Sequence, residues 1–213
     1  MEREEVMVKK KRKTRSDKKR DVKPTISYDL KQCIYRLSYI TNTPVKDVVE
    51  IFCEKGLKSK KVIDQLSKYF RRNLQYRNTF YIGDLQRESL QRKNHSIHNE
   101  RVTTRFSQQT YENIKSLSDA LDVTPTMATA LLLDASVKNS NIINAFVKHY
   151  LGNELDARRM KELKQVLKFI NKNNPYEQEV SWFSLFSMIH EEVQESTQNI
   201  KKVIGNWLDK HIR

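Results

Sequence analysis

Apolar side chains recur every three or four residues along most of this chain, which is the spacing of one face of an α-helix. Two such stripes lie in different halves of the chain and consist of Leu30, Ile34, Leu37 and Ile40, and of Tyr111, Ile114, Leu117 and Leu121. Only four glycines and four prolines interrupt the 213 residues, so helix-breaking positions are rare. The pattern predicts a mainly α-helical protein.

The two halves contain an internal repeat. Residues 40–70 align with residues 121–151, and a Thr-Pro pair falls at the same place in both copies, beginning at Thr43 and at Thr124. Threonine followed by proline is typical of a helix start, with threonine as the N-cap and proline in the first turn. The repeat therefore predicts helix, short turn, helix and a third helix twice over, with the second helix of the first copy ending near Gly56.

A short segment precedes the first helix of each copy and alternates in the manner of a half-buried β-strand. In the second copy this segment is Arg101–Phe106, and in the first copy a weaker alternation runs from Val22 to Tyr28, where Pro24 is compatible only with a strand end. The side chains predicted to face outward are Lys23, Thr25 and Ser27 in the first copy, and Arg101, Thr103 and Arg105 in the second.

A short strand with basic and hydroxyl residues on its outer face, followed by two helices joined by a turn, resembles the ribbon-helix-helix family of DNA-binding proteins. Two copies in one chain resemble the tandem, TraY-like organisation of relaxosome accessory proteins from conjugative plasmids. The resemblance implies that two strands pair antiparallel into a ribbon that enters the major groove, where base edges distinguish all four base pairs. The six outward residues would then read bases, with the first copy, which lacks an outward arginine, as a weaker half-site or only an architectural partner.

The resemblance also implies that the second helix of each copy anchors a DNA phosphate at its N-terminus, where free backbone N–H groups and the helix dipole attract an anion. The residues expected at these two points are Thr43, Val45 and Lys46, and Thr124, Thr126 and Met127. Whether the two copies pair within one chain or across a dimer stays open from sequence.

The charge of the chain fits a polyanionic partner. The formal net charge is +14, and residues 152–213 hold only ten Lys or Arg against nine Asp or Glu, so nearly all of the excess lies in residues 1–151. A basic arm at the start of the chain is expected to be disordered when free and to neutralise phosphates, the alternative being a solubilising tail. Its cations are Lys9, Lys10, Lys11, Arg12, Lys13, Arg15, Lys18, Lys19 and Arg20.

The C-terminal region carries a different pattern. One apolar stripe contains Met160, Leu163, Val166, Leu167 and Ile170, and a second runs from Trp182 to Leu208 after a break at Pro175. A helical region with aromatic clusters and little net charge suits oligomerisation or partner binding, although plain core packing explains it too. The residues expected at such an interface are Trp182, Phe183, Phe186, Ile189 and Trp207.

Other classes of function have little support in the sequence. We find no phosphate-binding glycine loop, nucleophile motif or paired carboxylates, so we expect no enzyme, and no cofactor or metal. His95 and His98 are interpreted as a surface pair, and Cys33 and Cys53 as buried free thiols of a reducing compartment. No apolar run is long enough to cross a bilayer and the basic start lacks an apolar leader segment, so we expect a cytoplasmic, nucleoid-associated protein without a membrane partner.

Together these patterns predict five regions. They are a disordered arm (1–21), a first repeat (22–75), a basic linker with Arg77, Arg87, Arg92 and Lys93 that follows the DNA backbone (76–100), a second repeat (101–151) and a helical C-terminal region (152–213). The predicted fold is mainly α, with tandem ribbon-helix-helix units. The expected function is sequence-specific double-stranded DNA binding by a transcriptional regulator, such as a repressor, of a bacterial, plasmid or phage system. The alternatives are a relaxosome or partition accessory, and an adaptor or antitoxin that acts through the C-terminal helices; RNA binding is disfavoured because no aromatic strand platform is visible.

Overall fold

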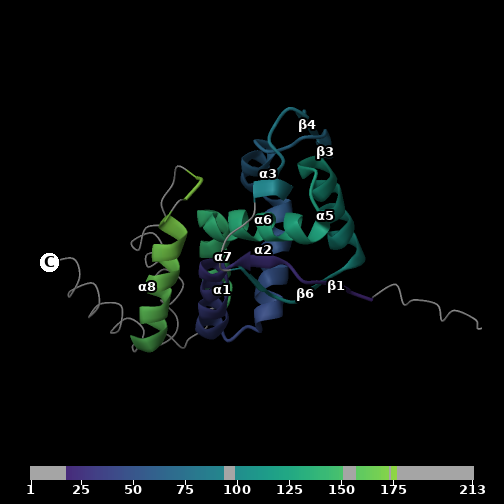
Figure 1. Ribbon diagram of the computed structural model, residues 1–213. Helices are drawn as coiled ribbons and strands as arrows, with labels where there is room; N and C mark the ends of the chain where they lie inside the picture. The colour runs from purple at the N-terminus through teal and green to yellow at the C-terminus, as the bar shows by residue number, and fades with distance from the viewer. Residues whose placement is uncertain (1–17, 94–98, 151–156, 173, 177–213) are drawn as a thin grey trace, which may run out of the picture.

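The computed structural model describes residues 18–93, 99–150, 157–172 and 174–176 (Figure 1). The described part is mainly helical with small two-stranded antiparallel sheets, which confirms the predicted helical class. Its helices are α1 (Tyr28–Thr41), α2 (Val45–Lys58), α3 (Lys60–Ser67), α4 (Leu90–Lys93), α5 (Gln108–Leu121), α6 (Pro125–Lys138), α7 (Ser140–Tyr150) and α8 (Ala157–Asn171). Its strands are β1 (Arg20–Val22), β2 (Thr25–Ser27), β3 (Leu74–Tyr76), β4 (Thr79–Tyr81), β5 (Asn99–Arg101) and β6 (Thr104–Phe106).

The strand segments of the two copies pair with each other within the single chain. Strand β1 pairs antiparallel with β6, and β2 pairs antiparallel with β5, so residues 20–27 run alongside residues 99–106. Pro24 lies between β1 and β2, directly before the first residue of β2, so it adjoins a strand end as expected. It has no N–H to donate, but its carbonyl accepts a hydrogen bond from the Val102 N–H at 3.1 Å, so the pairing continues across the break. We call this paired segment the ribbon.

Each ribbon strand leads into a pair of helices joined by a tight turn. The hydroxyls of Ser27 and Ser107 cap α1 and α5 by accepting a backbone N–H three residues on. Both helices end at a residue in the left-handed conformation, Asn42 (φ 52°) and Asp122 (φ 56°). Asparagine and aspartate tolerate this conformation better than most residues, so these two positions stop the helices without glycine.

The second helix of each copy begins differently. Thr124 caps α6 as predicted, because its hydroxyl accepts the Met127 N–H at 3.3 Å. The prediction for Thr43 is wrong: its hydroxyl donates to the Thr41 carbonyl at 3.2 Å, and the cap position of α2 is taken by Pro44, whose side chain has no polar atom to accept an N–H. Only one copy therefore has a side-chain cap at this point.

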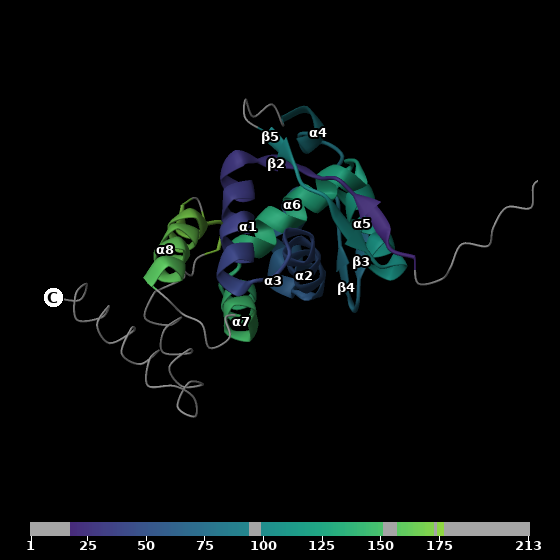
Figure 2. The ribbon, with the colours of Figure 1, turned by 90° about the horizontal axis from the view of Figure 1, so that it is seen from below.

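Helices α2 and α6 cross at the centre of the molecule (Figure 2). Helix α2 ends at Lys58, close to the predicted stop near Gly56, but Gly56 lies inside the helix and is not the residue that follows its end. Gly56 faces α6, where a Cβ atom would lie 1.9 Å from the Ser136 hydroxyl, so glycine permits a close helix approach here and does not end the helix. Beside the crossing, the rings of Phe52 and Phe146 lie 4.8 Å apart.

The ribbon covers these central helices in a crossed manner. Strand β6 of the second copy contacts α2 of the first, while β2 of the first copy contacts α6 of the second (Figure 2). The side chains of Val22, Ile26, Val102 and Phe106 point into this interface and are buried. Each copy therefore completes its core with a strand from the other.

The stretch 76–100, expected to be a linker, is folded in part. Strands β3 and β4 form a hairpin whose Tyr76 hydroxyl donates to the Leu57 carbonyl and whose Tyr81 hydroxyl donates to Asp64 at 2.5 Å. The Arg87 guanidinium donates to the main-chain carbonyls of Ser67, the last residue of α3, and of Phe70, at 2.8 and 3.0 Å. Arg87 thus holds the connection against the domain, and Arg92 and Lys93 belong to the short helix α4.

Helix α8 packs against α1 (Figure 1). All five residues of the predicted stripe in this helix are buried, and the Glu162 carboxylate pairs with Arg36 at 2.7 Å. For this helix the structure favours the core-packing alternative. The proposed interface residues Trp182, Phe183, Phe186, Ile189 and Trp207 lie outside the described residues, as do His95 and His98.

Cys33 and Cys53 are buried free thiols, as the sequence predicted. Burial raises the pKa of both thiols far above the ordinary value, because a thiolate would lose its solvation in the core. Within the described ranges, no helix combines the length and the apolar character that crossing a bilayer requires.

The buried aromatic pair at the helix crossing gives a test of this packing. We expect Phe52→Ala to lower the free energy of unfolding by about 3–5 kcal/mol, because the side chain is fully buried and leaves a cavity. The control is Phe80→Ala in β4, where a 57% exposed side chain should cost no more than about 0.5 kcal/mol. Urea unfolding followed by circular dichroism measures both, and equal losses would contradict the packing described.

Candidate nucleic-acid interface

The outer face of the ribbon collects the side chains that the sequence predicted to face outward. Burial alternates along both strand segments, with every second residue exposed. The six exposed residues of the prediction are Lys23, Thr25 and Ser27 on one strand, and Arg101, Thr103 and Arg105 on the other. The predicted alternation is therefore present in both copies, and the antiparallel pairing brings the two sets onto one surface.

The register of the ribbon fixes which of these residues are neighbours. Thr25 lies opposite Arg101, and Ser27 lies opposite Asn99, which extends the same exposed face by one position. Sequence reasoning missed Asn99, although the alternation of Arg101 and Thr103 continued one step backwards would have found it. Among the described residues, Arg101 forms no ion pair, so its guanidinium projects from the ribbon with its donors available.

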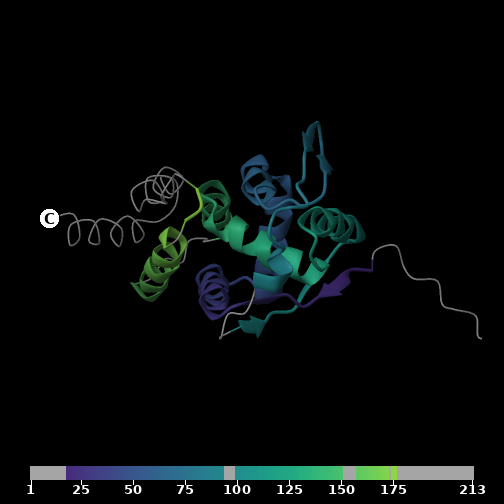
Figure 3. The same ribbon diagram turned by 45° about the horizontal axis from the view of Figure 1, so that its top comes forward.

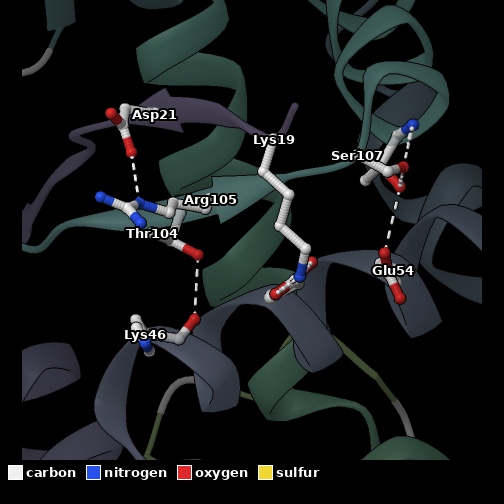
Figure 4. A network of polar contacts seen from close by, with 9 residues as sticks. Lys19, Asp21, Lys46, Glu54, Thr104, Arg105 and Ser107 are labelled. Carbon is white, nitrogen blue, oxygen red and sulfur yellow. Dashed lines mark hydrogen bonds and ion pairs between the residues drawn. The ribbon is translucent and has the colours of Figure 1, made fainter. Parts of the chain in front are cut away.

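Arg105 has an acidic neighbour that the sequence analysis also missed. Asp21 lies opposite it in the register and accepts a hydrogen bond from the Arg105 Nε at 2.7 Å (Figure 4). The two side chains are 60% and 58% exposed, so this is a surface ion pair, which contributes at most about 1 kcal/mol. The pair orients Arg105 and lowers the positive charge at this end of the ribbon, without burying the guanidinium.

The underside of the ribbon is tied to the helical layer. The Thr104 side chain is fully buried, and its hydroxyl donates to the Lys46 carbonyl in the first turn of α2 at 2.9 Å (Figure 4). On the preceding strand, β5, Glu100 forms an ion pair with Lys31 of α1. These contacts fix the ribbon relative to α1 and the start of α2.

The predicted phosphate-anchoring residues lie at the first turns of α2 and α6. Val45 and Lys46 are the first two residues of α2, and the Lys46 side chain is exposed. The same turn contains Asp47, whose negatively charged carboxylate would repel an anion bound there. In α6 the Met127 N–H is already donated to the Thr124 hydroxyl, so this group is not available to a phosphate as the prediction assumed.

The end of the basic arm is attached to the domain. Lys19 pairs with Glu50 at 2.6 Å (Figure 4). Arg20 donates to Gln108 at 3.0 Å, and its guanidinium lies 5.9 Å from the centre of the Tyr111 ring. Residues 18 and 19 therefore lead into β1, which begins at Arg20, in contrast to the disorder expected for the whole arm. The cations from Lys9 to Arg15 lie outside the described residues.

A cleft of about 450 Å³ lies between α2, the β3–β4 hairpin and the start of α5. Its apolar lining includes Leu57 and Leu117, and its polar lining includes the Ser107, Thr110 and Glu54 side chains, which are linked by hydrogen bonds (Figure 4). Its volume lies in the usual range for small-ligand sites. Within the part of the chain that the structure describes, no cluster of side chains could hold a metal ion.

Comparison of the chain with protein-family models, with curated proteins and with solved structures finds no match. The assignment of a function therefore depends on the geometry of the ribbon face.

Two neighbouring threonines test that geometry. Thr104→Val keeps the shape of a buried side chain but removes its hydrogen bond to the Lys46 carbonyl, so we expect a loss of about 0.5–1.5 kcal/mol in the free energy of unfolding. Thr103→Val changes an exposed side chain one residue away, and we expect no measurable loss. Thermal and urea unfolding compare the two variants; a reversed order would mean that the ribbon presents its other face to solvent.

Proposed function

We propose that this protein is a non-enzymatic, sequence-specific double-stranded DNA-binding protein of the tandem ribbon-helix-helix type. The observation that carries the proposal is the ribbon, which a single chain forms from two distant segments and whose exposed face holds Arg101, Arg105 and Lys23 beside hydroxyl residues. A two-stranded β-ribbon fits the width of the major groove, where base edges carry a distinct pattern for each base pair.

The chemistry of the exposed face suits base reading. A guanidinium can donate two parallel hydrogen bonds to the O6 and N7 atoms of guanine, which is the commonest specific contact in the major groove. Arg101 in β5 and Arg105 in β6 stand four residues apart on the same side of the ribbon, while Thr25 opposite Arg101 can contact a neighbouring base through its hydroxyl or methyl group. We therefore expect guanine to dominate the preferred sequence.

The two halves of the site are unequal. Strand β1–β2 offers Lys23, Thr25 and Ser27, whereas strand β5–β6 offers the two arginines. Because both strands belong to one chain, no symmetry forces the half-sites to be identical, as it does in a homodimer. The proposed target is accordingly two adjacent half-sites of related but different sequence and different strength.

Affinity beyond base reading would come from phosphates. Lys46 and the first N–H groups of α2 lie next to the ribbon, and Thr126 of α6 corresponds to Val45 in the alignment of the two copies. The cations of the arm add a contribution that does not depend on sequence and weakens with salt. We propose a transcriptional regulator as the biological role, for which mapping of bound sites to promoters, as opposed to replication or transfer origins, is the deciding observation.

Substitution of the ribbon arginines tests the function. We expect Arg101→Ala or Arg105→Ala to cost about 1–3 kcal/mol in binding to the preferred sequence, obtained by selection from random duplexes, and to relax the preference at one position each. Arg158→Ala on α8, which removes an exposed arginine away from the ribbon, is the matched control. Fluorescence anisotropy at fixed salt measures the affinities. If the ribbon variants discriminate selected from random DNA as well as the control does, the proposed reading face is wrong.

The Asp21–Arg105 ion pair generates a second test. Asp21→Asn removes a negative charge from the exposed face and releases the Arg105 guanidinium, so we expect DNA affinity to rise a few-fold. When Asp21→Asn is combined with Arg105→Ala, the part of the gain in DNA affinity that comes from the released Arg105 guanidinium should disappear. A double-mutant cycle of the two substitutions measures that part. Unchanged or weaker binding by Asp21→Asn would show that the carboxylate itself contributes to recognition, for example by accepting from cytosine N4.

A further inference from the structure

A second basic surface lies on the side of the molecule opposite the ribbon. Figure 3 shows the ribbon strands at the lower edge and the β3–β4 hairpin with α3 at the upper edge, with α2 and α6 between them. Residues 55–77 of this region contain eight Lys or Arg and a single acidic residue, Asp64. We define the α3–hairpin face by its exposed cations Lys58, Lys60, Lys61, Lys68 and Arg77.

The contacts in this region keep these cations together and open to solvent. The buried side of α3, which packs on the core, consists of Val62, Ile63 and Leu66. Lys60 and Lys61 lie on the opposite, exposed side. The hairpin is held against α2 and α3 by the tyrosine hydrogen bonds to Leu57 and Asp64, so Lys58 and Arg77 line the same cleft.

Few charges on the face are neutralised. Among the described residues, Lys58, Lys60 and Lys61 form no ion pair, and Arg77 stacks 5.4 Å from the Tyr76 ring. The single acid of the region, Asp64, already accepts a hydrogen bond from the Tyr81 hydroxyl. The face therefore presents a net positive charge to solvent.

The second copy of the repeat shows that the fold does not require these cations. In the alignment of the two copies, the positions of Lys58, Lys60 and Lys61 are taken by the neutral residues Asn139, Asn141 and Ile142. Asn139 and Ile142 are buried, and Tyr176, which donates to the Ala135 carbonyl at 2.9 Å, packs beside Asn139. The second copy thus has part of this surface covered by its own chain and is neutral at these three positions, whereas the first copy leaves its surface open and basic.

We propose that the α3–hairpin face binds the phosphate backbone of a second DNA duplex, so that one chain bridges two duplex segments. The lysines from Lys60 to Lys68 span about 12 Å of helix axis, over which a DNA strand passes three or four phosphates. The duplex on the ribbon cannot also reach this face without bending around the domain, and bending DNA so sharply over a short length costs several kcal/mol. The inference rests on the proposed function for the first duplex and extends it to a second.

The experiment uses the full chain and two short duplexes, of which the first has the preferred sequence obtained by selection and the second has random sequence. One duplex is immobilised and saturated with protein, unbound protein is removed, and capture of a second, fluorescent duplex is measured between 50 and 200 mM salt, conditions under which phosphate contacts are strongly salt-dependent. The face variant carries Lys58→Gln, Lys60→Gln, Lys61→Gln and Lys68→Gln. The matched control removes four exposed lysines elsewhere, through Lys115→Gln, Lys161→Gln, Lys164→Gln and Lys168→Gln.

We expect the wild type and the control to capture the second duplex, and the face variant to retain the first duplex while capturing the second roughly tenfold less, with a salt slope shallower by about 3 to 4. Equal capture by the face variant and the control overturns the inference, because bridging would then arise from oligomers or from charge in general. If the wild type holds the first duplex but captures no second one, the inference is wrong and the proposed function stands. If the wild type binds no duplex at all, the proposed function is wrong as well. If the face variant loses binding to phosphatidylserine vesicles but captures DNA normally, the face binds membrane and the inference is wrong.

Discussion

The antiparallel pairing of residues 20–27 with residues 99–106 is the constraint on which the rest of the structure depends. Strands of three residues contribute little alone, and an isolated two-stranded ribbon is marginal in water. Here the buried side of the ribbon, including the fully buried Phe106 and Thr104, packs on α2 and α6. Because each strand covers the central helix of the other copy, neither copy has a complete core without its partner, and the helical layer and the exposed face form together.

Formation of the ribbon within one chain frees the two halves to differ. A symmetric dimer must present every residue twice, whereas this chain places arginines on one strand and Lys23 with hydroxyl residues on the other. The same freedom extends to the side opposite the ribbon, where α3 is open and basic while the equivalent surface near α7 is partly covered by Tyr176 at Asn139. The buried residues of the two copies are arranged with pseudo-symmetry, whereas their exposed residues differ. This pattern is expected if the two copies contact different parts of a DNA assembly.

The sequence predicted those features that depend on local periodicity. The alternation of exposed and buried residues around Arg101 to Phe106 identified the outward set, because burial on a strand repeats every two residues, and the Thr124 cap followed from the Thr-Pro pair. Features that arise from contacts distant in sequence were missed. The role of Asp21 depends on its ion pair with Arg105, and the role of Gly56 depends on its close approach to Ser136 of α6. Thr43 shared the Thr-Pro signal but not the cap, since the local turn directs its hydroxyl back to Thr41.

Disulfide formation between engineered cysteines tests most directly whether the two strand segments pair within one chain. Thr25 and Arg101 are opposed in the register, and the native thiols are buried, so cysteines at Thr25→Cys and Arg101→Cys should be the ones that react under mild oxidation. Pairing within one chain predicts a cross-linked monomer that migrates ahead of the reduced protein in a denaturing gel and forms at a rate independent of protein concentration. A covalent dimer that forms faster as concentration rises would contradict it.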